Sequence, residues 1–120
     1  MRVAGLGFRA SATVGSLRDA LRRAGGAADL LATLERKAQA APIRALAAEL
    51  GLPVVGIGAE RLAAQPVLTR SAAVARRLGT GSLAEAAALA AAGPGARLVA
   101  PRVVSADGLA TAAIAEGRGA

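Results

Sequence analysis

Two glycines and an arginine near the start of the chain could bind an anion. The stretch Val3–Ser11 has the sequence VAGLGFRAS, in which a strand-like apolar run meets Gly5 and Gly7 and is followed by Phe8 and Arg9. Glycines at a strand end let backbone N–H groups approach a ligand, and an arginine beside them offers a fork of donors that fits a carboxylate. We therefore predict an anion-binding turn; the simpler alternative is a tight turn without a ligand.

The same stretch partly matches the glycine fingerprint of dinucleotide-binding domains. That fingerprint needs a third glycine, where this chain has Ala10, and an acidic residue about twenty positions later, near Asp29. Alanine is tolerated at the third position in some such motifs, so the match is partial. Because Arg9 occupies the turn and the helix starts only beyond Ser11, we favour a carboxylate over a pyrophosphate as the ligand.

Further loops supply hydroxyl groups, glycines and a cation before predicted helices. Thr33 and Lys37, the only lysine of the chain, follow the second predicted strand. The other candidate ligand-binding residues lie in two later loops and in the helix that follows them: Thr69, Ser71, Gly79, Gly81, Ser82 and Glu85. Since parallel strands end at one edge of a sheet and helix N-termini attract anions, we expect these groups to line one crevice with Arg9. Each loop alone is also explained as a helix cap, and Glu35–Lys37 as a solvated charge cluster.

A catalytic group is harder to identify, because the chain contains no histidine and no cysteine. Their absence removes the usual general base and the commonest metal ligands, so we expect no metal site and no cofactor. Glu85 is the candidate for proton transfer, which it could share only with Lys37, Asp107 or a hydroxyl group. The alternative explanation of Glu85 is structural: it lies three residues after Ser82, as in a capping box at the start of a helix.

The net charge of +7, from 15 basic and 8 acidic residues, favours anionic partners. A nucleic acid is not the expected one, because Phe8 is the only aromatic residue and the arginines are scattered over many elements. The longest apolar run, Ala86–Gly93, is too short to cross a bilayer, and no secretory signal is recognisable. We expect a cytoplasmic protein that binds a small anion and neither nucleic acid nor membrane.

Alternating apolar runs and helical stretches predict a single α/β domain over residues 1–120. The expected strands are Arg2–Leu6, Ala28–Thr33, Leu52–Ile57, Arg97–Ala100 and Thr111–Ala115. The expected helices are one to Arg23 capped by Thr13 or Ser16, Pro42–Leu50, Glu60–Ala64, Ala72–Leu78 capped by Ser71, and one that starts at Ser82. Hairpin-turn residues at Ser105–Gly108 make the last two strands antiparallel, so the sheet is mixed and mostly parallel.

Two of these helices carry more specific expectations. The helix from Pro42 should bury Ile43, Leu46, Ala47 and Leu50 on one face. The helix after Ser82 consists almost entirely of alanine, so neighbouring backbones must approach it closely.

Six motifs in a fixed order resemble one protein family. They are GLGFRAS, ATLERK, LAAELGLPVVGI, TRSAAV, GTGSLAEAAAL and SADGLATAAIA, which together extend over Val3–Ala115. In this order they resemble the CobE family of cobalamin (vitamin B12) biosynthesis, whose domain also forms the C-terminal part of CbiG. The resemblance implies a three-layer α/β/α domain that acts in building the corrin ring.

The resemblance also implies an anionic tetrapyrrole as the ligand. Corrin (precorrin) intermediates carry peripheral acetate and propionate groups around a broad apolar ring, which suits a crevice with arginine and lysine at its rim. Two hypotheses remain: a non-enzymatic carrier of a corrinoid intermediate, with other enzymes of the pathway as partners, or a hydrolase acting on that intermediate, as in the lactone opening by CbiG. The missing histidine and cysteine favour the carrier, and the other CbiG domains are not in this sequence, so we do not transfer the hydrolase activity.

Overall fold

A five-stranded sheet forms the centre of the part of the chain that the structure, a computed structural model, describes: residues 1–63 and 80–117. The strands are β1 (Arg2–Phe8), β2 (Leu30–Leu34), β3 (Val54–Ile57), β4 (Arg97–Val104) and β5 (Ala110–Glu116). The helices are α1 (Val14–Arg23), the 3-10 turn η1 (Glu35–Lys37), α2 (Ala41–Leu50), α3 (Ala59–Ala63) and α5 (Thr80–Ala92). The helix expected over Ala72–Leu78, with its cap at Ser71, lies outside the described residues.

The strand order in the sheet is β3-β2-β1-β5-β4. The β1–β2 and β2–β3 pairs are parallel, whereas β5 is antiparallel to both β1 and β4. Strands β1 to β4 therefore run in one direction and β5 runs against them, which confirms the mixed sheet and the hairpin through Ser105–Gly108. We call the edge where β1, β2 and β3 end, after Phe8, Leu34 and Ile57, the carboxyl edge, and the opposite one the amino edge.

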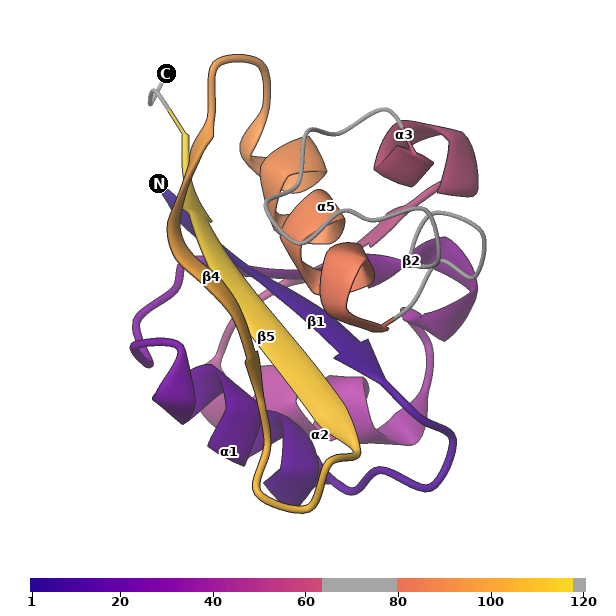
Figure 1. Cartoon of the computed structure of the whole chain (residues 1–120). Coiled ribbons are helices and arrows are strands. Elements are labelled where there is room, and N and C mark those ends of the chain that lie inside the picture. The colour runs from indigo at the N-terminus through magenta and orange to yellow at the C-terminus, as the bar shows by residue number, and fades with distance from the viewer. Residues whose placement is uncertain (64–79, 118–120) are drawn as a thin grey trace.

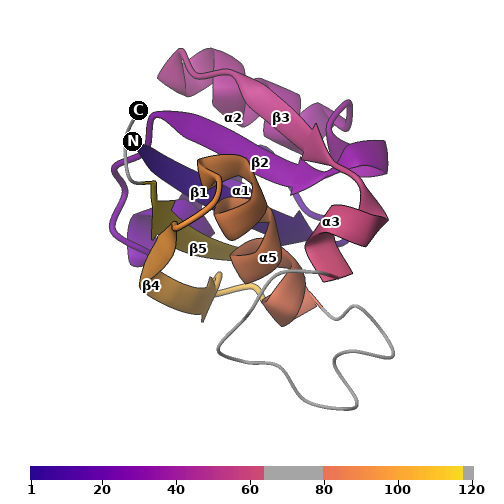
Figure 2. The ribbon, with the colours of Figure 1, turned by 90° about the horizontal axis from the view of Figure 1, so that it is seen from above.

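Helices cover both faces of this sheet, as the three-layer prediction requires (Figure 1). Alternate residues of β1, namely Ala4, Leu6 and Phe8, pack against α1 and α2. Val3, which precedes Ala4, lies on the other face, in a cluster with residues of α3 and α5. Figure 2 shows α5 lying over the middle of the sheet, with α3 beside it.

The expected cap of α1 is confirmed, and α2 ends at Leu50 as expected. The side chain of Thr13 accepts from the backbone N–H of Ser16 (3.2 Å), and the Ser16 hydroxyl accepts from the N–H of Thr13 (3.1 Å), so the two cap α1 together. Gly51 ends α2 in the left-handed conformation, at a φ of 69°. The stripe on α2 is only partly as predicted: Ile43 and Leu46 are buried, but Leu50 is 41% exposed. Leu50 is the last helical residue, and it lies beyond the core that the earlier turns contact.

Two further expectations are wrong. Strand β1 does not end at Leu6 but continues to Phe8, so Gly5 and Gly7 lie inside a paired strand and not in a turn. Helix α5 begins at Thr80, so Ser82 lies within its first turn and is not an N-cap. The sequence spacing S-x-x-E fits a helix interior as well as a capping box, and only the position of the helix start separates the two cases.

The two ends of the described chain lie side by side. The N–H of Gly117, directly after β5, donates to the carbonyl of Met1 (2.9 Å), and both lie at the amino edge (Figure 2). Among the described helices, none combines the length and the apolar character that crossing a membrane requires.

Candidate functional site

Arg9 lies at the carboxyl edge as an exposed cation. It follows β1 directly, and its backbone N–H donates to the carbonyl of Leu109 (2.9 Å), which fixes the main chain against the start of β5. Within the described part of the chain, its guanidinium group forms no hydrogen bond or ion pair. The structure thus presents an arginine fork to solvent at the edge where open α/β sheets bind ligands.

Lys37 lies at the same edge, as expected from parallel strands. It ends η1, directly after β2, and its Nζ donates to the carbonyl of Phe8 (2.8 Å) while lying 4.8 Å from the centre of the Phe8 ring. The contact ties the end of β2 to the end of β1. Since an ammonium group has three donors, Lys37 can hold this strand end and still donate to a ligand. The Phe8 ring itself is buried in the core on the α1 side.

Thr33 and the two glycines have structural contacts. Thr33 is fully buried, and its hydroxyl donates to the carbonyl of Leu6 (2.8 Å) across the β1–β2 pair. A Cβ on Gly5 would lie 1.9 Å from the Ala84 carbonyl oxygen and 2.7 Å from the Ala88 nitrogen, so the missing side chain makes room for α5. Gly7 pairs with Thr111, whose hydroxyl lies 3.4 Å from the Gly7 carbonyl. The glycines serve sheet and helix packing, which corrects the expectation of an anion-binding turn.

The N-terminus of α5 also lies toward the carboxyl edge. Ala84 contacts Gly5 in mid-strand, whereas Ala92, at the other end of α5, contacts Gly117 at the amino edge. The first turn of α5, with Gly81 and Ser82, therefore approaches the same edge as Arg9, and the positive end of the helix dipole adds positive potential there. The expected contributions of Thr69, Ser71 and Gly79 lie outside the described residues.

Glu85 is buried and not poised at the surface. Its side chain has no exposed area, and Oε2 accepts a hydrogen bond from the backbone N–H of Arg102 (3.0 Å). Strand β4 is irregular at this point, because its register with β5 shifts between Ala100 and Val103. Arg102 is exposed at this irregularity, and it is not among the ligand-binding candidates that the sequence predicts. Pro101 was the available signal, since proline within a strand marks an edge strand or a bulge.

The tip of the β4–β5 hairpin is held on α1 by Asp107. Its carboxylate accepts from the hydroxyls of Ser105 (2.5 Å) and Ser16 (2.6 Å) and from the N–H of Leu109 (3.0 Å). These bonds, led by that from Ser105, lower the pKa of Asp107. Because Leu109 accepts from the Arg9 N–H, Asp107 indirectly fixes the main chain of Arg9. Asp107 therefore supports the site and is not a free proton carrier.

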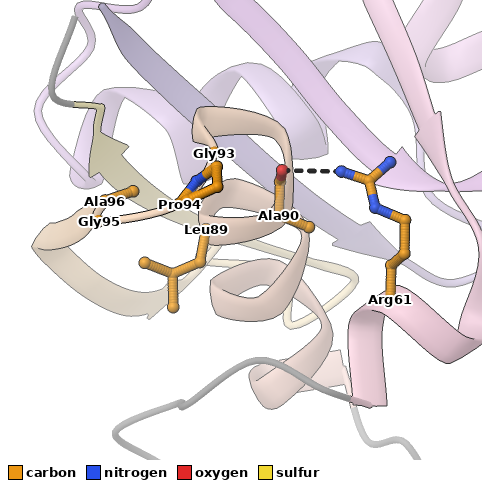
Figure 3. A pocket seen from close by; sticks show the side chains of 7 residues that line it. All are labelled: Arg61, Leu89, Ala90, Gly93, Pro94, Gly95 and Ala96. Carbon is orange, nitrogen blue, oxygen red and sulfur yellow. Dashed lines mark hydrogen bonds between the residues drawn. The ribbon is translucent and has the colours of Figure 1, made fainter.

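Two pockets formed by described residues lie elsewhere. One of about 350 Å³ lies at the C-terminal end of α5, lined by Arg61, Leu89, Ala90 and residues 93–96 (Figure 3). There the Arg61 guanidinium donates to the Ala90 carbonyl (3.0 Å), so its charge offsets the negative end of the helix. The other, of about 340 Å³, lies between α2 and β3 and includes Arg44. Neither contains Arg9 or Lys37, so we base the site on the charged groups of the carboxyl edge.

Fold and site together define a three-layer α/β/α domain with a cationic carboxyl edge. Residues 2–115 match the family model described as "Cobalamin synthesis G C-terminus", and the chain belongs to this family. It is thus a protein of the cobalamin biosynthesis pathway, of the type represented by CobE and the C-terminal domain of CbiG. No curated protein sequence matches the chain.

Solved structures agree with this assignment. The chain is similar to CobE, a protein from the cobalamin (vitamin B12) biosynthetic pathway, with 32% identity and a TM-score of 0.80 over 96% of this chain and 89% of the other. It is also similar to the cobalamin biosynthesis protein chiG from Agrobacterium tumefaciens, with 39% identity and a TM-score of 0.73 over 99% and 100%. A putative cobalamin biosynthesis protein G homolog from Sulfolobus solfataricus shares the fold at 17% identity and a TM-score of 0.70, over 95% of this chain and 36% of the other.

Proposed function

We propose that this domain binds an anionic corrin-ring intermediate of cobalamin biosynthesis at the carboxyl edge and carries it to another enzyme of the pathway in the cytoplasm. The observation that carries the proposal is the exposed Arg9 guanidinium, which has no partner within the described residues and is fixed through its main chain. Lys37 and the first turn of α5 add positive potential at the same edge. The family supplies the chemistry of the ligand, since corrin intermediates carry many peripheral carboxylates.

The alternative is a hydrolase that acts on the same intermediate. Hydrolysis needs a group that can exchange a proton with a bound water or substrate. Glu85, the candidate from the sequence, is fully buried and accepts from a backbone N–H, which favours a structural role. We therefore retain the carrier as the proposed function.

Equilibrium dialysis against cobyrinic acid, a corrin with peripheral acetic and propionic acid groups, tests the proposal. Wild-type protein should bind it, and Arg9→Ala should weaken binding about tenfold to a hundredfold, since a hydrogen bond to a charged group contributes about 1.5–3 kcal/mol. The matched control is Arg97→Ala, which removes another exposed arginine side chain, at the amino edge. Absence of binding by the wild type, or equal losses in both variants, would contradict the proposal.

A further inference from the structure

Strand β4 contains a bulge at Pro101 and Arg102. Ala100 pairs with Ile114 and Val103 pairs with Ala112, so Pro101 and Arg102 together face the single residue Ala113. A bulge of this kind leaves an N–H group outside the sheet ladder and redirects the neighbouring side chains. Because Pro101 has no N–H group, the donor that needs an acceptor is that of Arg102.

Glu85 provides this acceptor from α5. Its Oε2 lies 3.0 Å from the Arg102 nitrogen, and the whole Glu85 side chain is buried. The bond is possible because α5 lies directly on the sheet in this row: Gly5, which pairs with Ala113, has no side chain to hold the helix away. The shape of the bulge is thus fixed from α5, by a side chain that does not itself reach the surface.

The bulge turns Arg102 toward the α5 face of the sheet. Ala100 and Val103 both pack against the core cluster on the α1 face, whereas Pro101 and Arg102 lie opposite Ala113, which pairs with Gly5 directly under α5. Val104 follows on that side by strand alternation, and its side chain is 42% exposed. Arg102 is exposed as well, and within the described residues its guanidinium has no partner. A cation and an apolar side chain therefore lie together beside the N-terminal half of α5.

We propose that Arg102 binds a peripheral carboxylate of the corrin ligand, that Val104 contacts the apolar ring, and that Glu85 is a positioning residue that acts through the bulge. This inference rests on the proposed function and extends its site from Arg9 across the sheet to the C-terminal end of β4. It also assigns the buried Glu85 a role in binding and not in proton transfer.

Arg102→Ala should weaken the binding of cobyrinic acid about tenfold, since one charge-assisted hydrogen bond is lost. Arg97→Ala, at the other end of the same strand, is the matched control and should bind as the wild type does. The fully methyl-esterified corrin lacks the carboxylates and should not distinguish Arg102→Ala from wild type. If the wild type binds and Arg102→Ala binds equally well, the inference is wrong and the proposed function stands; if the wild type does not bind, both fall.

Replacements of Glu85 test the positioning role. Glu85→Gln keeps an oxygen acceptor for the Arg102 N–H and should bind cobyrinic acid within about threefold of wild type, whereas Glu85→Ala should lose as much affinity as Arg102→Ala. Combining Glu85→Ala with Arg102→Ala should cost no further affinity, because both act on one contact. Glu85→Asp, whose shorter side chain withdraws the carboxylate, replaces Glu85→Ala if that variant does not fold. A folded Glu85→Ala or Glu85→Asp protein with wild-type affinity would overturn the role.

Discussion

At the level of single residues, the missing side chain of Gly5 decides how closely α5 lies on the sheet. The two atoms nearest to a hypothetical Cβ, the Ala84 oxygen and the Ala88 nitrogen, belong to the helix backbone and cannot rotate away. At the far end of the helix, a Cβ on Gly117 would lie 2.7 Å from the Ala92 oxygen. The alanine-rich helix therefore lies against glycine in its middle and at its C-terminal end, and this close approach brings Glu85 within reach of β4.

Gly5→Ala should destabilise the domain by about 1–3 kcal/mol, because overpacking a closely packed contact forces backbone shifts. Gly58→Ala is the control: a Cβ there meets no atom within 4 Å and the backbone is not left-handed, so its effect on stability should stay within about 0.5 kcal/mol or be slightly favourable. Urea denaturation of both variants and of wild type measures the difference. Equal stability of the two variants would show that α5 shifts away at little cost.

At the level of elements, the β4–β5 hairpin is fixed to α1 by two carboxylates. Asp107 holds the turn from within, through Ser16 and Ser105. Asp19, on α1, accepts from the N–H of Ala106 (2.8 Å) and pairs with two arginines of its own helix. The hairpin in turn fixes the main chain of Arg9, so the rigidity of the candidate site depends on these acidic side chains.

This attachment should weaken in acid. The backbone N–H of Ala106, and then the Arg23 side chain, lower the pKa of Asp19 from 3.8 to about 2. Because this pKa lies below that of the unfolded chain, the stabilising effect is complete above the ordinary value of 3.8 and is lost as the pH falls toward 2. Thermal melting from neutral pH down to this range should show that the melting temperature of wild type, higher than that of Asp19→Asn at neutral pH, falls to that of the variant. A constant difference between the two melting temperatures would contradict this account.

At the level of the whole molecule, the net charge of +7 gives the surface a positive potential. Several arginines are offset by acids: Arg18 pairs with Glu49 at 2.6 Å, and Arg97 with Glu116 at 3.0 Å. Within the described residues, Arg9 and Arg102 have no such partner, so the unbalanced charge includes the two arginines of the proposed site.

Binding of cobyrinic acid should therefore depend on salt. Raising the ionic strength from about 0.05 M to about 0.5 M shortens the screening length to a few ångströms and should weaken binding severalfold. The methyl-esterified corrin should show no such dependence, and a double variant with Arg9→Ala and Arg102→Ala should show a smaller one. Salt titrations of the dialysis experiment measure all three. A wild-type affinity that does not change with salt would contradict an electrostatic mode of binding.

The sequence predicts the order of elements well because its signals are local. Thr13 and Ser16, which are three residues apart, together cap one helix, and Gly51 ends another. Turn-forming residues join the last two strands in a hairpin. The sequence also predicts that Arg9 and Lys37 lie at one edge, because the loops that follow neighbouring parallel strands lie at the same edge of the sheet.

The site differs from the prediction wherever a contact joins distant segments. Gly5 was expected in a ligand-binding turn, but a glycine is needed there because α5, which begins at Thr80, leaves no room for a side chain. Glu85 was explained by a neighbouring serine, yet it accepts from the backbone N–H of Arg102, on a strand whose bulge no local pattern fixes. Periodicity reports which face of an element is buried, but it carries no information about which neighbour lies on that face or how the strands are aligned.

Met1 and Gly117 meet at the amino edge, which is an arrangement suited to a domain inserted in or fused to other polypeptides. The Gly117 N–H and the Met1 carbonyl are joined by a hydrogen bond, so a polypeptide fused at either end would leave the domain at one spot, opposite Arg9. The similar fold covers 36% of the Sulfolobus solfataricus chain, so this fold also occurs as one part of a longer chain. The same geometry permits circular permutation, with a short linker between the ends and new termini opened in a surface loop. Such fusions and rearrangements leave the carboxyl edge free to face whatever partner the attached polypeptide provides.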